Sequence, residues 1–198
     1  MNHCIDTEVI RIGSLTFVSV GQLFPHQFHN FHAPDFIFPI GYKVIRNYWS
    51  LTEVNKRAAY ICTIADVGGK PEFRVSTTIM ENGKEVEKSF ADTSARAVWM
   101  QILLVIEKLR KDNKLVKMFP RHATGDDLFG FNEPNIIKVL ESLPGIESLT
   151  DYNFKYGRNP LIELPLAVNP TGCARSEAGL RTRVKRVHNF QRTTGAGV

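Results

Sequence analysis

The amino-acid sequence predicts an α+β fold, in which helices pack on one side of a largely antiparallel sheet. The first observation is Asn82-Gly83, which lies between two strand-like runs at residues 73–80 and 84–90. This dipeptide favours a two-residue hairpin turn, because both turn positions require positive φ. The second observation is a broad apolar stripe over residues 95–111, which is typical of a helix on a sheet.

Three earlier strands are predicted from runs rich in β-branched and aromatic residues. These runs are residues 15–20, 42–49 and 59–64. Residues 1–12 are expected to form a short leader. A loop is expected at residues 67–71, where two glycines and a proline lie close together.

Two helices follow the hairpin. The first, residues 95–111, is preceded by Asp92, Thr93 and Ser94, whose side chains are good N-cap acceptors. The second is expected to have Asn132 as its N-cap and Pro134 in its first turn.

The apolar face of the second helix recurs at helical spacing and consists of Ile136, Val139, Leu140 and Leu143. The sequence Leu143-Pro144-Gly145 is expected to end it. Aromatic and polar residues then alternate over 152–156, which predicts a half-buried final strand.

Composition indicates one globular domain followed by a basic tail. The chain has 198 residues and a net charge of +5, and much of the positive excess follows Arg175. Its three cysteines are widely spaced and form no CxxC motif, which favours free thiols in a reducing compartment. No apolar run is long enough to span a membrane, and the N-terminus lacks the plan of a signal peptide.

No catalytic motif was found. The sequence contains no GxSxG elbow, P-loop, HExxH motif or dinucleotide-binding glycine pattern. The adjacent acids Asp126 and Asp127 are interpreted as solvated surface residues. The sequence therefore predicts no catalytic residues, no cofactor and no enzyme activity.

The histidines of residues 26–32 and the aromatic residues of the strands each allow a functional interpretation besides a structural one. His26, His29 and His32 could line one face of a helical turn and bind zinc or copper. A histidine-containing loop without metal is preferred, because a structural zinc normally needs four ligands. The strand aromatics could stack on nucleic acid bases, but core packing explains their alternation more simply.

Most of the chain resembles the FYR module, which is named for its phenylalanine and tyrosine content. The C-terminal half is identified by LFGF, LPG and YxFxYGR within residues 128–158, and the N-terminal half by GQLFPHQFHNFH and PIGYKVIRNYWS. The halves are assigned to residues 13–73 and 74–166. The resemblance implies that they form one domain, followed by a flexible tail at residues 167–198.

The tail contains GCARSE, which is similar to the WIN motif of trithorax-related (MLL-type) histone H3 lysine-4 methyltransferases. The residues concerned are Gly172, Cys173, Ala174, Arg175, Ser176 and Glu177. In that family the arginine enters the central cavity of a WD-repeat propeller, which implies the same partner here. A long side chain with a planar guanidinium suits such a narrow channel. The basic segment 182–186 fits either a nuclear-import or DNA-backbone patch or a solvated linker.

The resemblance implies a non-catalytic, chromatin-associated interaction module that acts in the nucleus. Its expected partner is the WD-repeat propeller subunit of a histone methyltransferase complex, with other complex subunits or chromatin as further candidates and no membrane. The alternative is a stand-alone nuclear FYR-domain regulator of transcription, of the transforming-growth-factor-beta-regulator type.

Overall fold

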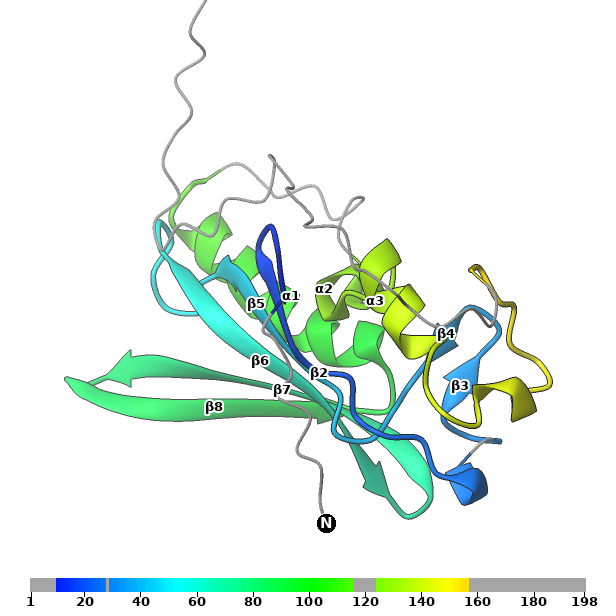
Figure 1. Cartoon of the computed structure of the whole chain (residues 1–198). Helices are drawn as coiled ribbons and strands as arrows, with labels where there is room; N and C mark the ends of the chain where they lie inside the picture. The colour runs from blue at the N-terminus through cyan, green and yellow to red at the C-terminus, as the bar shows by residue number, and fades with distance from the viewer. Residues whose placement is uncertain (1–9, 28, 116–123, 157–198) are drawn as a thin grey trace, which may run out of the picture.

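The computed structural model describes residues 10–27, 29–115 and 124–156. Six strands form its main sheet, which is antiparallel throughout, in the order β1-β2-β5-β6-β7-β8 (Figure 1). Their bounds are Ile10–Ile12, Leu15–Ser19, Lys43–Trp49, Arg57–Val67, Lys70–Glu81 and Lys84–Asp92. A separate ladder joins β3 (His32–Ala33) to β4 (Phe36–Ile37). The predicted α+β class is confirmed.

The helices lie on one side of the main sheet (Figure 1). They are α1 (Ala95–Asp112), α2 (Gly125–Phe129) and α3 (Pro134–Leu140), with 3-10 turns η1 (Pro25–Gln27) and η3 (Ile146–Ser148). Alternate residues of β6 and β7 are buried beneath them, as the two-residue period of a strand requires. Within the described residues, no helix has the length and apolar content to cross a membrane.

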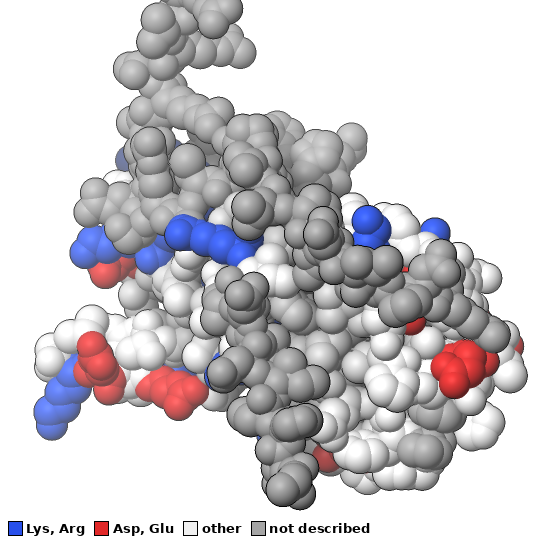
Figure 2. Space-filling model, in the orientation of Figure 1, with Lys and Arg blue, Asp and Glu red and all other residues white. Residues whose placement is uncertain are grey.

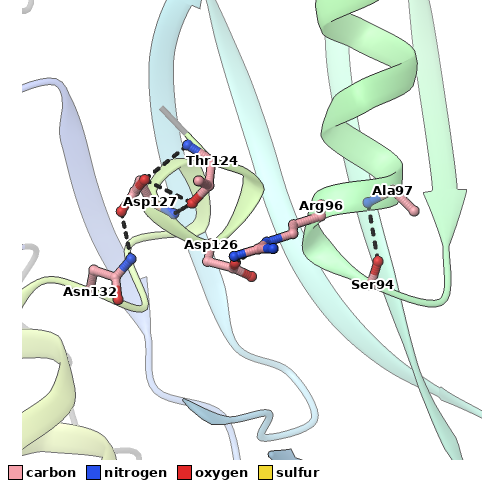
Figure 3. Close-up of polar contacts among 7 residues, drawn as sticks. All are labelled: Ser94, Arg96, Ala97, Thr124, Asp126, Asp127 and Asn132. Atoms are coloured by element: carbon pink, nitrogen blue, oxygen red, sulfur yellow. Dashed lines mark hydrogen bonds and ion pairs between the residues drawn. The ribbon is translucent and has the colours of Figure 1, made fainter. Parts of the chain in front are cut away.

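Helix α1 forms as the sequence predicts. Ser94 is its N-cap and accepts a hydrogen bond from the Ala97 N–H at 3.1 Å (Figure 3). The indole of Trp99 is fully buried and packs against the rings of Tyr48 and Tyr60 on the sheet. An aromatic core therefore fixes this helix across β5 and β6.

The predicted Asn82-Gly83 hairpin is confirmed, and both residues have positive φ. The expected loop at residues 67–71 is instead a second tight hairpin, in which only Gly68 and Gly69 separate β6 from β7. Both glycines have positive φ, so the turn needs no further residues. The sheet consequently continues without interruption from the N-terminal half of the chain into the C-terminal half.

Several predicted boundaries differ from the structure. The last three residues of the expected leader form β1, where Ile12 is buried. Glu133, not Asn132, is the N-cap of α3, and this helix ends at Leu140 rather than at Leu143. The strand predicted at residues 152–156 is absent, because side-chain contacts and a buried carboxylate hold that segment in place of a ladder.

Candidate functional site

The predicted partner-binding residues Gly172–Glu177 and the basic segment 182–186 lie outside the described residues. The described chain ends at Tyr156, on the segment that leads toward them. The geometry that bears on function is therefore the anchorage of residues 152–156 and the junction that holds the two halves of the domain together.

The buried carboxylate of Glu141 anchors the last described segment. It follows α3 directly, and its oxygens accept hydrogen bonds from the Tyr152 hydroxyl at 2.9 Å, the Lys155 N–H at 2.7 Å and the Tyr156 N–H at 2.8 Å. Burial raises the pKa of Tyr152, and the hydrogen bond to Glu141 raises it further. One side chain thus satisfies backbone donors that a strand partner would otherwise satisfy.

Further contacts fix the same segment against the N-terminal half. The Asn153 N–H donates to the carbonyl of Pro34 at 2.8 Å. The ammonium group of Lys155 lies 5.5 Å from the centre of the Phe36 ring, a cation–π contact. The chain that leads to the tail is therefore positioned by residues from both halves.

Arg46 on β5 joins the halves from the inside of the domain. Its guanidinium donates to the carbonyls of Leu128 at 3.0 Å and Asp127 at 2.6 Å, and to the Ser14 hydroxyl at 2.9 Å. These carbonyls belong to α2, so the cation lies where carbonyl groups at a helix C-terminus favour positive charge. Burial lowers the pKa of Arg46, but a guanidinium stays protonated at neutral pH.

Tyr42 makes a second buried link between the halves. Its hydroxyl donates to the carbonyl of Phe129 at 2.7 Å, and its ring packs against Phe131 and Phe17. Phe129 and Phe131 stack on one another with ring centroids 5.4 Å apart. These phenylalanines and tyrosines therefore belong to a core that the two halves share.

Gly130 allows the turn between α2 and the core to lie close to β2. Its φ is +83°, and a Cβ atom there would lie 2.6 Å from Leu15 Cδ2 and 2.9 Å from Ile136 Cδ1. Only a glycine fits such a turn without displacing core side chains.

The interpretation of Asp126 and Asp127 as solvated acids is wrong. Asp126 is buried and accepts a hydrogen bond from Arg96 of α1 at 2.7 Å (Figure 3). Asp127 forms a capping box with Thr124 and accepts a hydrogen bond from Asn132. Burial by itself raises the pKa of Asp127, but these hydrogen bonds outweigh it and lower the pKa.

The three histidines do not assemble a site. His26 belongs to η1 and stacks on Phe24 with ring centroids 5.9 Å apart, whereas His32 belongs to β3. Among the described residues, no group of three or more histidine, cysteine or acidic side chains is placed to hold a metal ion. Cys62 is fully buried, and burial raises the pKa of its thiol to about 12, so it is protonated at neutral pH.

The sequence reasoning missed Arg46 and Glu141. A signal for Arg46 was present, because it shares an alternating register with the core residues Tyr42 and Val44 and so had to point inward. Glu141 had no comparable signal, since the groups that donate hydrogen bonds to it lie on a segment that the sequence predicts to be a strand.

Comparison with protein families matches residues 7–67 to the F/Y-rich N-terminus family (FYRN) and residues 70–157 to the F/Y rich C-terminus family (FYRC). The two matches meet at the turn that contains Gly68 and Gly69. The boundary between them is therefore a hairpin inside one sheet.

Three relatives illustrate the similarity. Histone-lysine N-methyltransferase trr of Drosophila melanogaster is 53% identical over 99% of this chain, which spans 8% of that protein. Human histone-lysine N-methyltransferase 2D is 42% identical over 94% of this chain, which spans 3% of it. Human transforming growth factor beta regulator 1 is 28% identical over 73% of this chain, which spans 33% of it.

Proposed function

The chain belongs to the FYRN–FYRC family, and from that premise we propose that it is a non-catalytic, chromatin-associated protein-interaction module. Two relatives are named as enzymes that methylate histone lysines, and histones are chromatin proteins. We therefore place the chain in the nucleus, in the context of a histone H3 lysine-4 methyltransferase complex. The buried Arg46, Tyr42 and Glu141 are engaged in holding the fold together, which supports a binding role rather than catalysis.

The proposed partner is a WD-repeat propeller subunit, bound through residues Gly172–Glu177. The observation that carries this proposal is the sequence GCARSE, which resembles the WIN motif and follows an FYR module. Arg175 would enter the central cavity of the propeller, where its planar guanidinium can stack between rings and donate to backbone carbonyls. Gly172 and Ala174 are small enough to let the backbone approach the rim of that cavity.

The anchorage by Glu141 supports this arrangement. It fixes the backbone at Lys155 and Tyr156, so the tail begins from a defined place on the domain. A propeller bound to the tail would then lie at a limited distance from the folded FYR module, set by the residues between Tyr156 and Gly172.

The share of this chain that each relative matches favours the hypothesis of a methyltransferase-type module over that of a stand-alone regulator. The similarity to the two methyltransferases extends over 99% and 94% of this chain, and so reaches into residues beyond the FYR module. The similarity to the regulator extends over 73%.

Calorimetric titration of the full chain against the propeller tests the proposal. We expect Arg175→Ala to weaken binding by about 2–4 kcal/mol, or about 30- to 700-fold, because a short segment depends on few anchor residues. Arg175→Lys should be almost as weak, since an ammonium group keeps the charge but loses the planar fork.

Arg183→Ala is the matched control, because it removes a nearby arginine outside the motif. Its affinity should equal that of the wild type at low and at high salt. Binding that depends equally on Arg183 and Arg175, and that weakens steeply with salt, would indicate a diffuse basic patch and refute the cavity contact.

A further inference from the structure

The main sheet splits between β6 and β7. Their ladder ends at the pair Tyr60–Thr77, although β6 begins at Arg57 and β7 continues to Glu81. Beyond that pair, β6 follows β5 and β7 follows β8, and the β7–β8 hairpin projects away from the rest of the sheet (Figure 1). We call this split, between residues 57–59 of β6 and residues 78–81 of β7, the fork.

The hairpin turns determine which backbone groups face the fork. Glu81 and Lys84 close a two-residue turn and so form a hydrogen-bonded pair between β7 and β8. Because strand residues alternate, the N–H and C=O of Thr78 and Met80 point away from β8, toward the fork.

The same reasoning applies to the other edge. Val67 and Lys70 close the two-residue turn between β6 and β7, so the odd-numbered residues of β6 direct their backbone groups toward β7. In agreement, Ile64 bonds on the opposite side, donating to the carbonyl of Tyr42 and accepting from Gly41. Arg57 and Ala59 therefore also face the fork.

A side chain closes the base of the fork. The buried hydroxyl of Thr77 donates to the carbonyl of Ala59 at 2.8 Å. Further out, the backbone groups of Arg57 and Met80 that face the fork have no backbone partner in the described part of the chain. Two strand edges thus face one another with hydrogen-bonding groups available.

The fork contains a groove of about 350 Å³, and Figure 2 shows the surface hollowed between the hairpin and the rest of the molecule. Ala58, Ala59, Ser76 and Thr78 line it, and such small side chains allow another backbone to approach. The outer edge of β8 differs, because lysine or glutamate occupies every position of residues 84–88 except Val86, and such charges discourage pairing.

One acidic side chain of the groove is placed to meet a cation on a ligand. Lys56 forms an ion pair with Glu53 at 2.8 Å, and the guanidinium of Arg57 lies over the Trp49 ring at 5.3 Å. Glu87 lines the same groove with no ion pair to another described residue. It lies opposite Thr78 on the neighbouring strand, so its carboxylate can be reached across a small side chain.

We propose that the fork binds an extended basic peptide as an additional strand between β6 and β7, with a lysine or arginine of the peptide meeting Glu87. The backbone edges supply affinity, and Glu87 with the small groove residues supplies selectivity. This site is separate from residues 172–177 and adds a second contact to the proposed function.

Nuclear magnetic resonance of the isotope-labelled full chain tests the site, with the end-blocked heptapeptide Thr-Val-Thr-Lys-Thr-Val-Thr as the probe. Binding should shift the amide signals of Arg57, Ala59, Thr78 and Met80. The same peptide with alternate amides N-methylated keeps its charge but loses strand donors, so it should not bind. An absence of shifts at millimolar peptide, or shifts confined to the outer edge of β8, would overturn the proposal.

Two pairs of variants separate backbone pairing from charge. Met80→Pro removes an N–H that faces the fork and no β7–β8 ladder bond, so it should weaken binding about 2- to 12-fold, whereas Met80→Ala should not. Glu87→Gln should weaken binding by up to about 5-fold.

Glu85→Gln is the control for Glu87→Gln, since Glu85 lies on the same strand and face but outside the groove lining. Equal losses for Glu85→Gln and Glu87→Gln would refute the charge contact. Arg175→Ala should leave peptide binding unchanged, so the fork and the propeller contact can fail independently.

Discussion

Replacing Arg46 with methionine tests whether a buried cation holds the two halves of the domain together. Methionine approximates the length of the arginine stem but donates no hydrogen bond. The substitution removes the donors to the carbonyls of Asp127 and Leu128 and to the Ser14 hydroxyl. All three acceptors lie on segments other than β5, so local strand structure should survive while the junction is lost.

The expected loss follows from those acceptors. A buried acceptor left without its donor costs about 1–3 kcal/mol. The Asp127 carbonyl retains a hydrogen bond from the Gly130 N–H at 3.1 Å, so only the Leu128 carbonyl carries the full cost. A buried methionine does not carry the cost of burying a charged guanidinium, and this difference offsets part of the loss from the unpaired acceptors. We therefore expect the free energy of unfolding to fall by about 2–4 kcal/mol, and the melting temperature by about 4–16 °C.

Urea and thermal unfolding of the full chain, followed by tryptophan fluorescence and circular dichroism, measure this change. Arg74→Met is the matched control, because Arg74 is exposed and pairs with Glu72 on the surface. Arg74→Met should lower the free energy of unfolding by no more than about 1 kcal/mol. A loss below about 1 kcal/mol for Arg46→Met, or equal losses for the two variants, would refute the proposed role of Arg46.

Two further predictions concern the same junction. Gly130→Ala should lower the free energy of unfolding by about 1–3 kcal/mol more than Gly83→Ala, because both glycines have positive φ but only the first would press a Cβ against core side chains; equal losses in thermal unfolding would contradict this. Because the pKa of Asp127 is lowered in the folded state, its stabilising contribution is present above the unfolded pKa of about 4 and is lost as pH falls through the lowered folded value. Urea midpoints between neutral and acidic pH should therefore fall less steeply for Asp127→Asn than for the wild type, and parallel profiles would exclude this role.

The elements that the sequence predicts correctly are those set by local chemistry. Asn82-Gly83 determines its turn through two adjacent residues, and Ser94 caps α1 through a contact three residues away. The sequence does not predict α2, because its five residues are too few to establish a helical period. Its capping box, Thr124 with Asp127, lies between the two helices that the sequence predicts.

The errors arise where distant contacts decide the structure. The alternation of residues 152–156 resembles a strand, but Tyr152 is directed by the buried carboxylate of Glu141 and by packing on Phe154. No local pattern reveals that carboxylate. The fork cannot be predicted from the sequence either, since it depends on where two long strands diverge rather than on the composition of either one.

The turn at Gly68 and Gly69 has a consequence for how the chain can be joined. A Cβ at either glycine would have nothing within 4 Å, and the eight pairs from Val67–Lys70 to Tyr60–Thr77 hold the strands together beside it. The ladder therefore carries most of the contacts between the two strands at this point. Each doubling of an inserted loop costs only about 0.6 kcal/mol, so long insertions fit here with the sheet intact. An insertion at this turn can therefore separate the FYRN and FYRC segments in sequence and still leave them paired as neighbouring strands.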